Sequence, residues 1–147
     1  MADIFLSYKR EDRAMAETIS GALERKGWSV WWDTRLAAGD LFDDVIEQEL
    51  DAAKCVVVLW SKLSVKSRWV RTEAGDGLER GILVPIKIDD VKPPLAFRRV
   101  HTADLTHPEL GGPEMETAFE RLVVDITRIV SPAEPPPRPR VSRPQNT

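Results

Sequence analysis

The segment Cys55–Trp60, with the sequence CVVVLW, is the stretch that most directly indicates the fold. Consecutive apolar residues without polar alternation are typical of a β-strand covered on both faces, as in the middle of a parallel sheet. Shorter apolar runs at Ile4–Ser7 and at residues 82–88 indicate two more strands. Pro85 lies inside the second of these runs and has no N–H to donate, which favours a sheet edge or a bulge there.

Helical patterns separate the apolar runs. Asp12 is expected to cap a helix that ends at Gly27, because Asp accepts backbone N–H groups at a helix start and Gly suits the left-handed position after a helix end. Residues 45–53 and 69–80 are two further expected helices, and Pro113 suits the first turn of a last one. The expected strands are residues 4–7, 28–33, 55–60, 82–88 and 100–105. This alternation predicts an α/β fold, a flavodoxin-like, open, doubly wound parallel sheet of five strands with helices on both faces.

The composition of the 147-residue chain narrows the classes of function. The single cysteine, Cys55, excludes an intrachain disulfide framework and a cysteine-rich zinc site, and two histidines exclude a three-histidine site, so no metal is expected. A net charge of −3 argues against direct binding of nucleic acid through its phosphates. No apolar run reaches the length of about 20 residues that a membrane span needs, and the N-terminus lacks a signal-peptide pattern. We expect no membrane partner and a cytoplasmic location.

The last residues, 132–147, differ in composition from the rest of the chain. They read PAEPPPRPRVSRPQNT, rich in proline and arginine and with a single aliphatic side chain. Such a segment buries too little apolar surface to offset the entropy lost on ordering. The sequence therefore predicts one domain over residues 1–131 and a disordered segment over 132–147, either a tail or a linker to a further domain.

The predicted sheet locates a ligand site. In open α/β sheets, ligands bind beyond the carboxyl ends of the strands where strand order reverses, here between the first and third strands. A phosphate-binding loop of the Walker type is absent, and the glycines of residues 74–81 fall within a helix rather than between strand and helix. The residues expected to meet at the reversal point are Ser7, Tyr8, Lys9, Arg10, Lys62, Trp69 and Glu73.

Trp69 and Glu73 are spaced by four residues on an expected helix, so the two side chains share one face. An indole beside a carboxylate suits the binding of a flat heteroaromatic ring next to a sugar. The same spacing also fits a packed tryptophan near a solvated surface glutamate. Spacing alone leaves both interpretations open.

Six segments recur in a consistent order and spacing: DIFLSYKR at 3–10, WD at 32–33, LAAGD at 36–40, VVVLWS at 56–61, SRWVRTE at 67–73 and ILVPI at 82–86. This series resembles the Toll/interleukin-receptor (TIR) domain family over roughly residues 1–131, including the proline of the fourth strand. Some members of this family are adaptors that act through TIR–TIR contacts. Others, including many prokaryotic members, cleave NAD+ at the nicotinamide–ribose bond and carry a glutamate on the helix after the third strand, often with a tryptophan four residues before it.

The resemblance implies an NAD+ hydrolase or cyclase of the prokaryotic type, active in antiviral defence, with NAD+ as substrate and no other cofactor. Glu73 is implied as the catalytic carboxylate, contacting the ribose, and Trp69 as a platform for nicotinamide or ribose. Lys9 and Arg10 are implied to hold phosphate oxygens, although a solvated charge pair fits them equally.

The resemblance also implies roles for the loop after the second strand. Asp33, Leu36 and Gly39 are implied to close the pocket, although Asp33 could simply cap the loop by accepting backbone amides. The loop over residues 34–43 is implied to contact a second copy of the chain. That self-association would activate the enzyme, triggered by a sensor domain or a partner protein. The alternative function is a non-catalytic TIR–TIR interaction module, either a signalling scaffold or an effector that mimics host adaptors.

Overall fold

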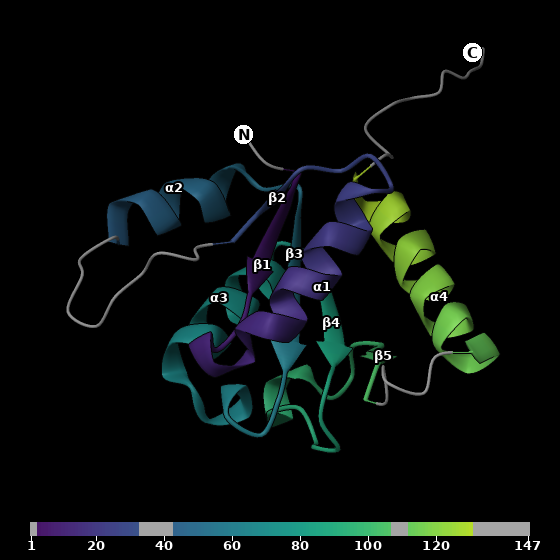
Figure 1. Ribbon diagram of the computed structural model, residues 1–147. Coiled ribbons are helices and arrows are strands. Elements are labelled where there is room, and N and C mark those ends of the chain that lie inside the picture. Colours follow the sequence, from purple (N-terminus) through teal and green to yellow (C-terminus); the bar gives the residue numbers. More distant parts are fainter. Residues whose placement is uncertain (1–2, 33–42, 107–111, 131–147) are drawn as a thin grey trace, which may run out of the picture.

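A computed structural model describes residues 3–32, 43–106 and 112–130 of the chain. Five parallel strands form one sheet in the order β2-β1-β3-β4-β5 (Figure 1). This is the flavodoxin-like order that the sequence predicted, with the reversal of strand order between β1 and β3. The strands are β1 (Ile4–Ser7), β2 (Val30–Trp31), β3 (Cys55–Trp60), β4 (Leu83–Lys87) and β5 (Ala103–Asp104).

Helices cover both faces of the sheet, which confirms the predicted doubly wound architecture. One face carries α1 and α4, and the other carries α2 and α3 (Figure 1). The helices are α1 (Arg13–Glu24), α2 (Asp43–Ala52), α3 (Arg68–Glu79) and α4 (Gly112–Val130). Two short 3-10 turns precede helices, η1 (Arg10–Asp12) before α1 and η2 (Ser64–Lys66) before α3, and a third, η3 (Leu95–Phe97), lies between β4 and β5.

β3 connects the two hydrophobic cores. Cys55, Val57 and Leu59 pack toward α1 and α4, while Val56, Val58 and Trp60 pack toward α2 and α3. Every residue of this strand is fully buried, as its unbroken apolar sequence predicted. Burial raises the pKa of the Cys55 thiol to about 12, so this side chain acts as a small apolar group.

The second and fifth strands are shorter than predicted. β2 contains two residues and pairs only with Ile4 and Phe5 at the beginning of β1. β5 also contains two residues and pairs only with Ile86 and Lys87 at the end of β4. Each lies at an edge of the sheet and has one neighbouring strand to pair with, so its length is limited by the contact with that neighbour.

Pro85 does not mark a sheet edge, because β4 lies between β3 and β5. Residues 82 and 88 exchange backbone hydrogen bonds with β3, whereas the Lys87 carbonyl accepts from Leu105 on the β5 side. Backbone groups alternate along a strand, so the nitrogen of Pro85 faces the β5 side, where pairing begins only at Ile86. The expectation of a sheet edge was therefore wrong, because β4 is an inner strand. Proline is tolerated at this position because its missing N–H removes no hydrogen bond from the sheet.

The predicted helix cap at Asp12 also differs from the structure. α1 begins at Arg13, directly after η1, and the Asp12 side chain accepts no backbone N–H of this helix. The helix ends at Glu24, earlier than predicted, and Gly27 takes the expected left-handed conformation in the turn that follows, at φ = +101°. None of the helices in the described part of the chain is both long and apolar enough to cross a bilayer.

Candidate functional site

Glu73 lies on the face of α3 that packs against the sheet. Its buried neighbours on this face are Val70, Ala74 and Gly77, at the spacing of three and four residues that defines one side of a helix. The helix starts at a cap in which Ser67 Oγ accepts the Val70 N–H at 3.2 Å. Glu73 is therefore turned inward, toward the carboxyl end of β1.

Gly77 sets how closely α3 approaches the sheet. A Cβ atom at this position would lie 2.8 Å from Val56 Cβ on β3, which is closer than packed carbons approach. Because glycine has no side chain, the helix axis can sit against the strand. The glycine that the sequence places inside a helix thus has a packing role one turn after Glu73.

Ser7 and Glu73 form the central contact of the site. Ser7 is the last residue of β1, and its Oγ donates a hydrogen bond to Glu73 Oε1 at 2.6 Å. Glu73 has only 6% of its surface exposed. This burial raises the pKa of Glu73 to about 7, because a charged carboxylate loses hydration there, while hydrogen bonds from Ser7 and Trp69 lower it. The carboxyl group therefore changes its charge near neutral pH.

Trp69 lies one turn before Glu73 and borders it on the solvent side. The tryptophan is 46% exposed, an unusual level for so large an apolar side chain. The pair therefore joins a buried ionisable oxygen to an accessible aromatic surface. Of the two interpretations that the spacing allowed, the one with a solvated glutamate and a packed tryptophan is contradicted, because the glutamate is buried and the tryptophan is not.

Of the other residues expected at the site, Tyr8 faces away from Glu73, while Lys9, Arg10 and Lys62 follow the ends of β1 and β3. Tyr8 packs on the opposite side of the sheet, with its ring edge-on to Trp32 at a centroid distance of 5.7 Å. Lys9 and Arg10 lie at the turn after β1, and the Lys9 side chain forms a partly exposed ion pair with Glu11 at 3.9 Å. Lys62 is exposed just after β3. The predicted residues Asp33, Leu36 and Gly39 lie outside the described residues.

The sequence analysis missed a polar network that ties the loop after β3 to η1. Ser61 Oγ donates to the Asp12 carboxylate, and Ser64 Oγ accepts the Ser61 N–H at 2.7 Å. The Lys62 N–H donates to Asp89 Oδ2 at 2.8 Å, which fixes the same loop from the side of β4. Burial raises the pKa of Asp12, and the Ser61 hydroxyl opposes this effect. The network holds the two loops that flank Ser7 and Glu73.

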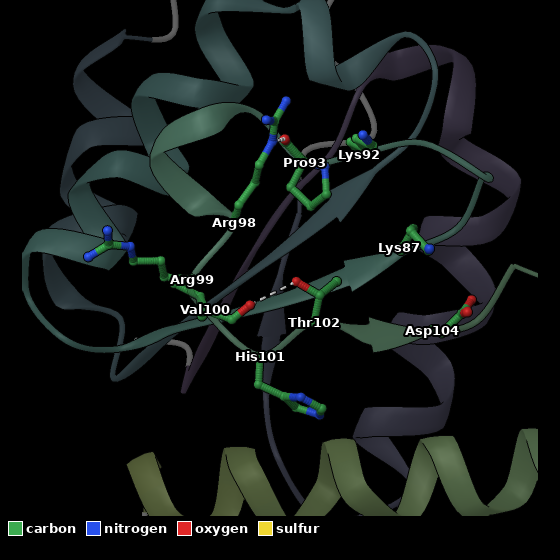
Figure 2. Close-up of a pocket in the computed structure, with 9 residues that line it drawn as sticks. All are labelled: Lys87, Lys92, Pro93, Arg98, Arg99, Val100, His101, Thr102 and Asp104. Carbon is green, nitrogen blue, oxygen red and sulfur yellow. Dashed lines mark hydrogen bonds between the residues drawn. The ribbon is translucent and has the colours of Figure 1, made fainter.

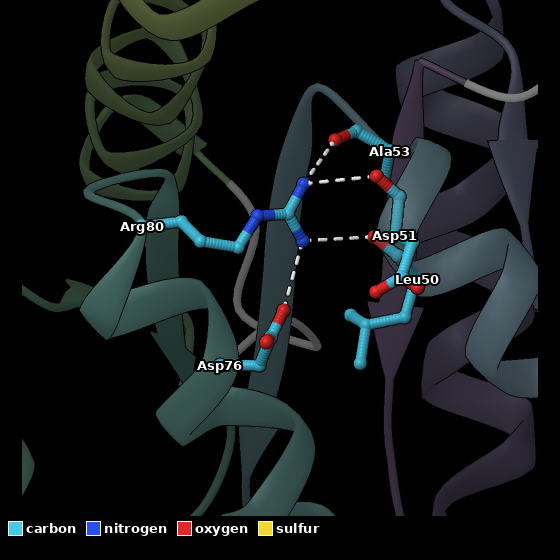
Figure 3. A network of polar contacts seen from close by, with 5 residues as sticks. All are labelled: Leu50, Asp51, Ala53, Asp76 and Arg80. Carbon is cyan, nitrogen blue, oxygen red and sulfur yellow. Dashed lines mark hydrogen bonds and ion pairs between the residues drawn. The ribbon is translucent and has the colours of Figure 1, made fainter.

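A second missed feature joins α3 to α2 at the other end of the helix. The Arg80 guanidinium donates to the carbonyl oxygens of Leu50, Asp51 and Ala53 at 2.9, 3.2 and 3.0 Å (Figure 3). It also pairs with Asp76 at 2.8 Å. The Leu50 carbonyl also accepts the Ala53 N–H, and Arg80 adds donors from α3 to the carbonyls at and just after the end of α2.

A groove of about 630 Å³ lies away from Glu73, at the carboxyl ends of β4 and β5 (Figure 2). It shares no lining residue with the Ser7–Glu73 contact, and no sequence motif indicated it. Among the described residues, no group of three or more His, Cys, Asp or Glu side chains is arranged to hold a metal ion.

Comparisons with known proteins agree with the fold. A family model described as TIR domain matches residues 4–123. The TIR domain of the Toll-related receptor TRR-2 from Hydra magnipapillata matches with a TM-score of 0.71 and 20% identity, covering 86% of this chain and 98% of that one. The TIR domains of the activated Roq1 resistosome, which directly recognises the pathogen effector XopQ, match with a TM-score of 0.62 and 20% identity over 86% and 99% of the chains.

A metazoan TIR-STING receptor from C. gigas, in complex with 2',3'-cGAMP, is also similar. Its TM-score is 0.68 at 22% identity, and the match covers 89% of this chain but 40% of the receptor. No curated protein sequence matches the chain. At these identities the structural similarity shows the fold.

Proposed function

The chain belongs to the TIR domain family, and from this premise we propose that it cleaves NAD+ at the bond between nicotinamide and ribose. We place it with the NAD-cleaving members of prokaryotic type, because the resemblance in sequence implies Glu73 as their catalytic glutamate and Trp69 as the tryptophan four residues before it. The observation that carries the proposal is the inward-facing Glu73 carboxyl group, buried against Ser7 and bordered by the exposed indole of Trp69.

The chemistry needs one carboxylate near the anomeric carbon. As the C–N bond breaks, its electron pair leaves with nicotinamide, which departs as a neutral ring and needs no general acid. The ribose gains oxocarbenium character, and an ionised Glu73 stabilises that positive charge. Water then forms a C–O bond with the anomeric carbon and releases a proton, giving ADP-ribose. An adenine nitrogen attacking the same carbon gives a cyclic product instead.

The other residues support binding. In this proposal Trp69 packs against nicotinamide or ribose, and Ser7 holds the carboxylate in place. Lys9 and Arg10 follow Ser7 at the carboxyl end of β1, and we propose that they contact diphosphate oxygens. Tyr8 does not face Glu73, so its proposed contribution is structural, through Trp32.

Self-association is the second part of the proposal. The residue range 34–43 is proposed to contact a second copy and, through Asp33, Leu36 and Gly39, to close over the substrate. Assembly of TIR domains in the activated Roq1 resistosome supports this view. We further propose a cytoplasmic function in defence against infection, with a sensor as trigger. Only its defence part is supported by the Roq1 resistosome, which directly recognises a pathogen effector.

The test is nicotinamide release from NAD+ by Glu73→Gln and by a matched variant on the same helix. Glu79 is exposed near the end of α3, so Glu79→Gln removes an equal charge without touching the site. We expect Glu73→Gln to lower kcat by about 100-fold or more, the scale of losing a preorganised electrostatic group. Glu79→Gln should retain the wild-type rate. Equal rates for all three proteins would remove Glu73 from the mechanism.

Enzyme concentration distinguishes an activated assembly from a simple monomeric enzyme. If a neighbour completes the site, the rate per molecule should rise with protein concentration before it levels off. A rate per molecule that is constant from nanomolar to high micromolar protein contradicts activation by assembly. An assembled protein that releases no nicotinamide supports the alternative function, a non-catalytic interaction module.

A further inference from the structure

Asp12 occupies the N-cap position of α1 but does not cap the helix. An aspartate at this position normally accepts a backbone N–H from the first turn, which stabilises the helix start. The Asp12 side chain accepts no such hydrogen bond, and it accepts the hydroxyl of Ser61 instead, 49 positions further along the sequence. A contact that would stabilise one helix is thus replaced by a contact that joins two loops.

The hydrogen-bond partners of the Ser61 hydroxyl are fixed by its surroundings. Ser61 is buried, and its Oγ accepts the Ser64 N–H at 3.0 Å. Ser64 Oγ accepts the Ser61 N–H at 2.7 Å and donates to the Leu59 carbonyl at 2.7 Å. A serine hydroxyl has one proton to donate, and that of Ser61 goes to Asp12. The loop after β3 is therefore bonded within itself and directs this donor at η1.

The turn η1 is not held by the hydrophobic core, because none of its residues is buried. It is closed by the Asp12 N–H, which donates to the Lys9 carbonyl at 2.7 Å, and Arg10 is its first residue. The hydrogen bond from Ser61 ties this turn to the loop that leads through η2 into α3, the helix of Glu73. The contact therefore links the two segments that carry the proposed diphosphate-binding and ribose-binding side chains.

The loop after β3 is also fixed from the side of β4. The Lys62 N–H donates to Asp89 Oδ2 at 2.8 Å, just after β4 ends. The strands β1, β3 and β4 are neighbours in the sheet, and their carboxyl ends lie at the same end of it (Figure 1). Hydrogen bonds that are joined in this way form one polar network across three loops. The network gives η1 a defined position relative to the sheet.

We propose that Asp12 and Ser61 are positioning residues for the substrate. Their hydrogen bond holds η1 so that Lys9 and Arg10 contact the diphosphate while Glu73 faces the ribose. This inference rests on the proposed cleavage of NAD+. The role needs a hydrogen-bond acceptor at residue 12, and this requirement distinguishes it from an electrostatic effect of the Asp12 charge on the nearby Lys9. Because the diphosphate is remote from the bond that breaks, losing the contact weakens substrate binding and leaves the chemical step unchanged.

The experiment measures kcat and KM for nicotinamide release from NAD+ at one fixed protein concentration. Asp12→Ala and Ser61→Ala each remove the hydrogen bond, whereas Asp12→Asn removes the charge and keeps an oxygen that accepts the Ser61 proton. Two matched controls lie on α1: Glu17→Ala removes an exposed carboxylate, and Ser20→Ala removes a buried hydroxyl. Hydrogen exchange of backbone amides, measured without NAD+, reports separately whether the two loops are coupled.

We expect Asp12→Ala and Ser61→Ala to raise KM about tenfold and to leave kcat within about twofold of the wild type. The double variant should be no worse than Ser61→Ala, because both substitutions remove the same hydrogen bond. Asp12→Asn and the two controls should keep the wild-type KM. In Asp12→Ala, the amides of residues 61–66 should exchange faster, although the substitution lies on the other loop.

The proposal is overturned if Asp12→Ala keeps the wild-type KM, or if Asp12→Asn raises KM as much as Asp12→Ala does. It is also overturned if the two alanine variants lower kcat at an unchanged KM, or lower only the thermal stability, since a merely structural contact would do the latter. A wild type that releases no nicotinamide contradicts the proposed function and, with it, this role in substrate binding. Wild-type release with an unchanged KM in the variants contradicts the positioning role alone.

Discussion

The Ser7 hydroxyl donates a 2.6 Å hydrogen bond to the Glu73 carboxyl group across 66 positions of the sequence. The contact joins the end of a central strand to the middle of α3, and both groups are buried. Ser7 stabilises the ionised form of Glu73, against the effect of burial. The serine thus affects the fraction of Glu73 that is ionised at a given pH. It can reach Glu73 because β1 lies beside β3, the strand that leads into α3.

Ser7→Ala should shift the pH dependence of NAD+ cleavage. Without the donor, the Glu73 pKa rises further above about 7, so kcat/KM falls at neutral pH and its acid limb moves to higher pH. We expect a shift of about one pH unit, since a hydrogen bond to a charged group is worth about 1.5–3 kcal/mol. Ser20→Ala removes another buried hydroxyl, on α1, and should leave the profile unchanged. A Ser7→Ala profile that keeps its midpoint would contradict this role.

Glu73→Gln should change how stability depends on pH. The folded-state pKa of about 7 lies above the ordinary value of 4.5, so the folded protein holds a proton that the unfolded chain has released. The fold is most stable with the Glu73 carboxyl group protonated. This stability is fully present below pH 4.5 and is lost as the pH rises through 7, because the buried group must then become charged. Between pH 4 and pH 8 the wild type should therefore lose about 3 kcal/mol relative to Glu73→Gln.

Urea denaturation of both proteins at several pH values measures the difference. Effects of the remaining acidic groups are common to the two proteins and cancel in the comparison. A difference that stays constant from pH 4 to pH 8 would mean that Glu73 titrates normally and is not buried as described.

Two glycines on α3 should respond oppositely to alanine. At Gly77 a Cβ would meet Val56 at 2.8 Å, so Gly77→Ala must displace the helix from the sheet and should destabilise by about 1–3 kcal/mol. At Gly75 a Cβ meets nothing within 4 Å, and alanine favours a helix, so Gly75→Ala should stabilise by up to about 1 kcal/mol. Thermal unfolding compares the two directly. Because Glu73 lies one turn from Gly77, Gly77→Ala should also lower activity.

The parts of the fold that the sequence could predict are those set by local pattern. Cys55–Trp60 was recognisable because a strand buried on both faces has no polar positions, and Gly27 because a helix end favours a left-handed residue. Strand pairing is not local in this sense. The lengths of β2 and β5 depend on where their neighbouring strands begin and end. The same is true of Pro85, whose nitrogen faces a part of β4 that β5 does not pair with.

The candidate site divides in the same way. Trp69 and Glu73 were found because four residues make one helical turn, and Ser7 because the fold places the first strand beside the third. Tyr8 follows Ser7 on a strand, and alternation of side chains could have shown that it faces the opposite side. The groove beside Arg98 matched no motif, although all of its described lining residues lie within one stretch of the chain, residues 87–104.

Arg80 is expected to stabilise the C-terminal end of α2. Its guanidinium donates hydrogen bonds to the carbonyls of Leu50, Asp51 and Ala53, at and just after the end of that helix (Figure 3). Arg80→Ala should destabilise the protein by about 1 kcal/mol, because the part-buried Ala53 carbonyl loses this donor while the Leu50 and Asp51 carbonyls are exposed to water. Arg80→Lys keeps the charge but cannot reach several carbonyls at once, so it should recover only part of the loss.

The sharper measurement of the Arg80 effect is local, by hydrogen exchange of backbone amides. In Arg80→Ala the amides of α2 should exchange faster, while those of α1, on the opposite face of the sheet, keep their wild-type rates. Arg68→Ala serves as the matched control, since Arg68 is exposed at the start of α3 and does not reach α2. Since α2 directly follows the range proposed to close over NAD+, its loosening should raise KM more than it lowers kcat. If α2 stays fully protected in Arg80→Ala, the guanidinium is a surface contact and the two helices are held together by Ile46 and its apolar neighbours alone.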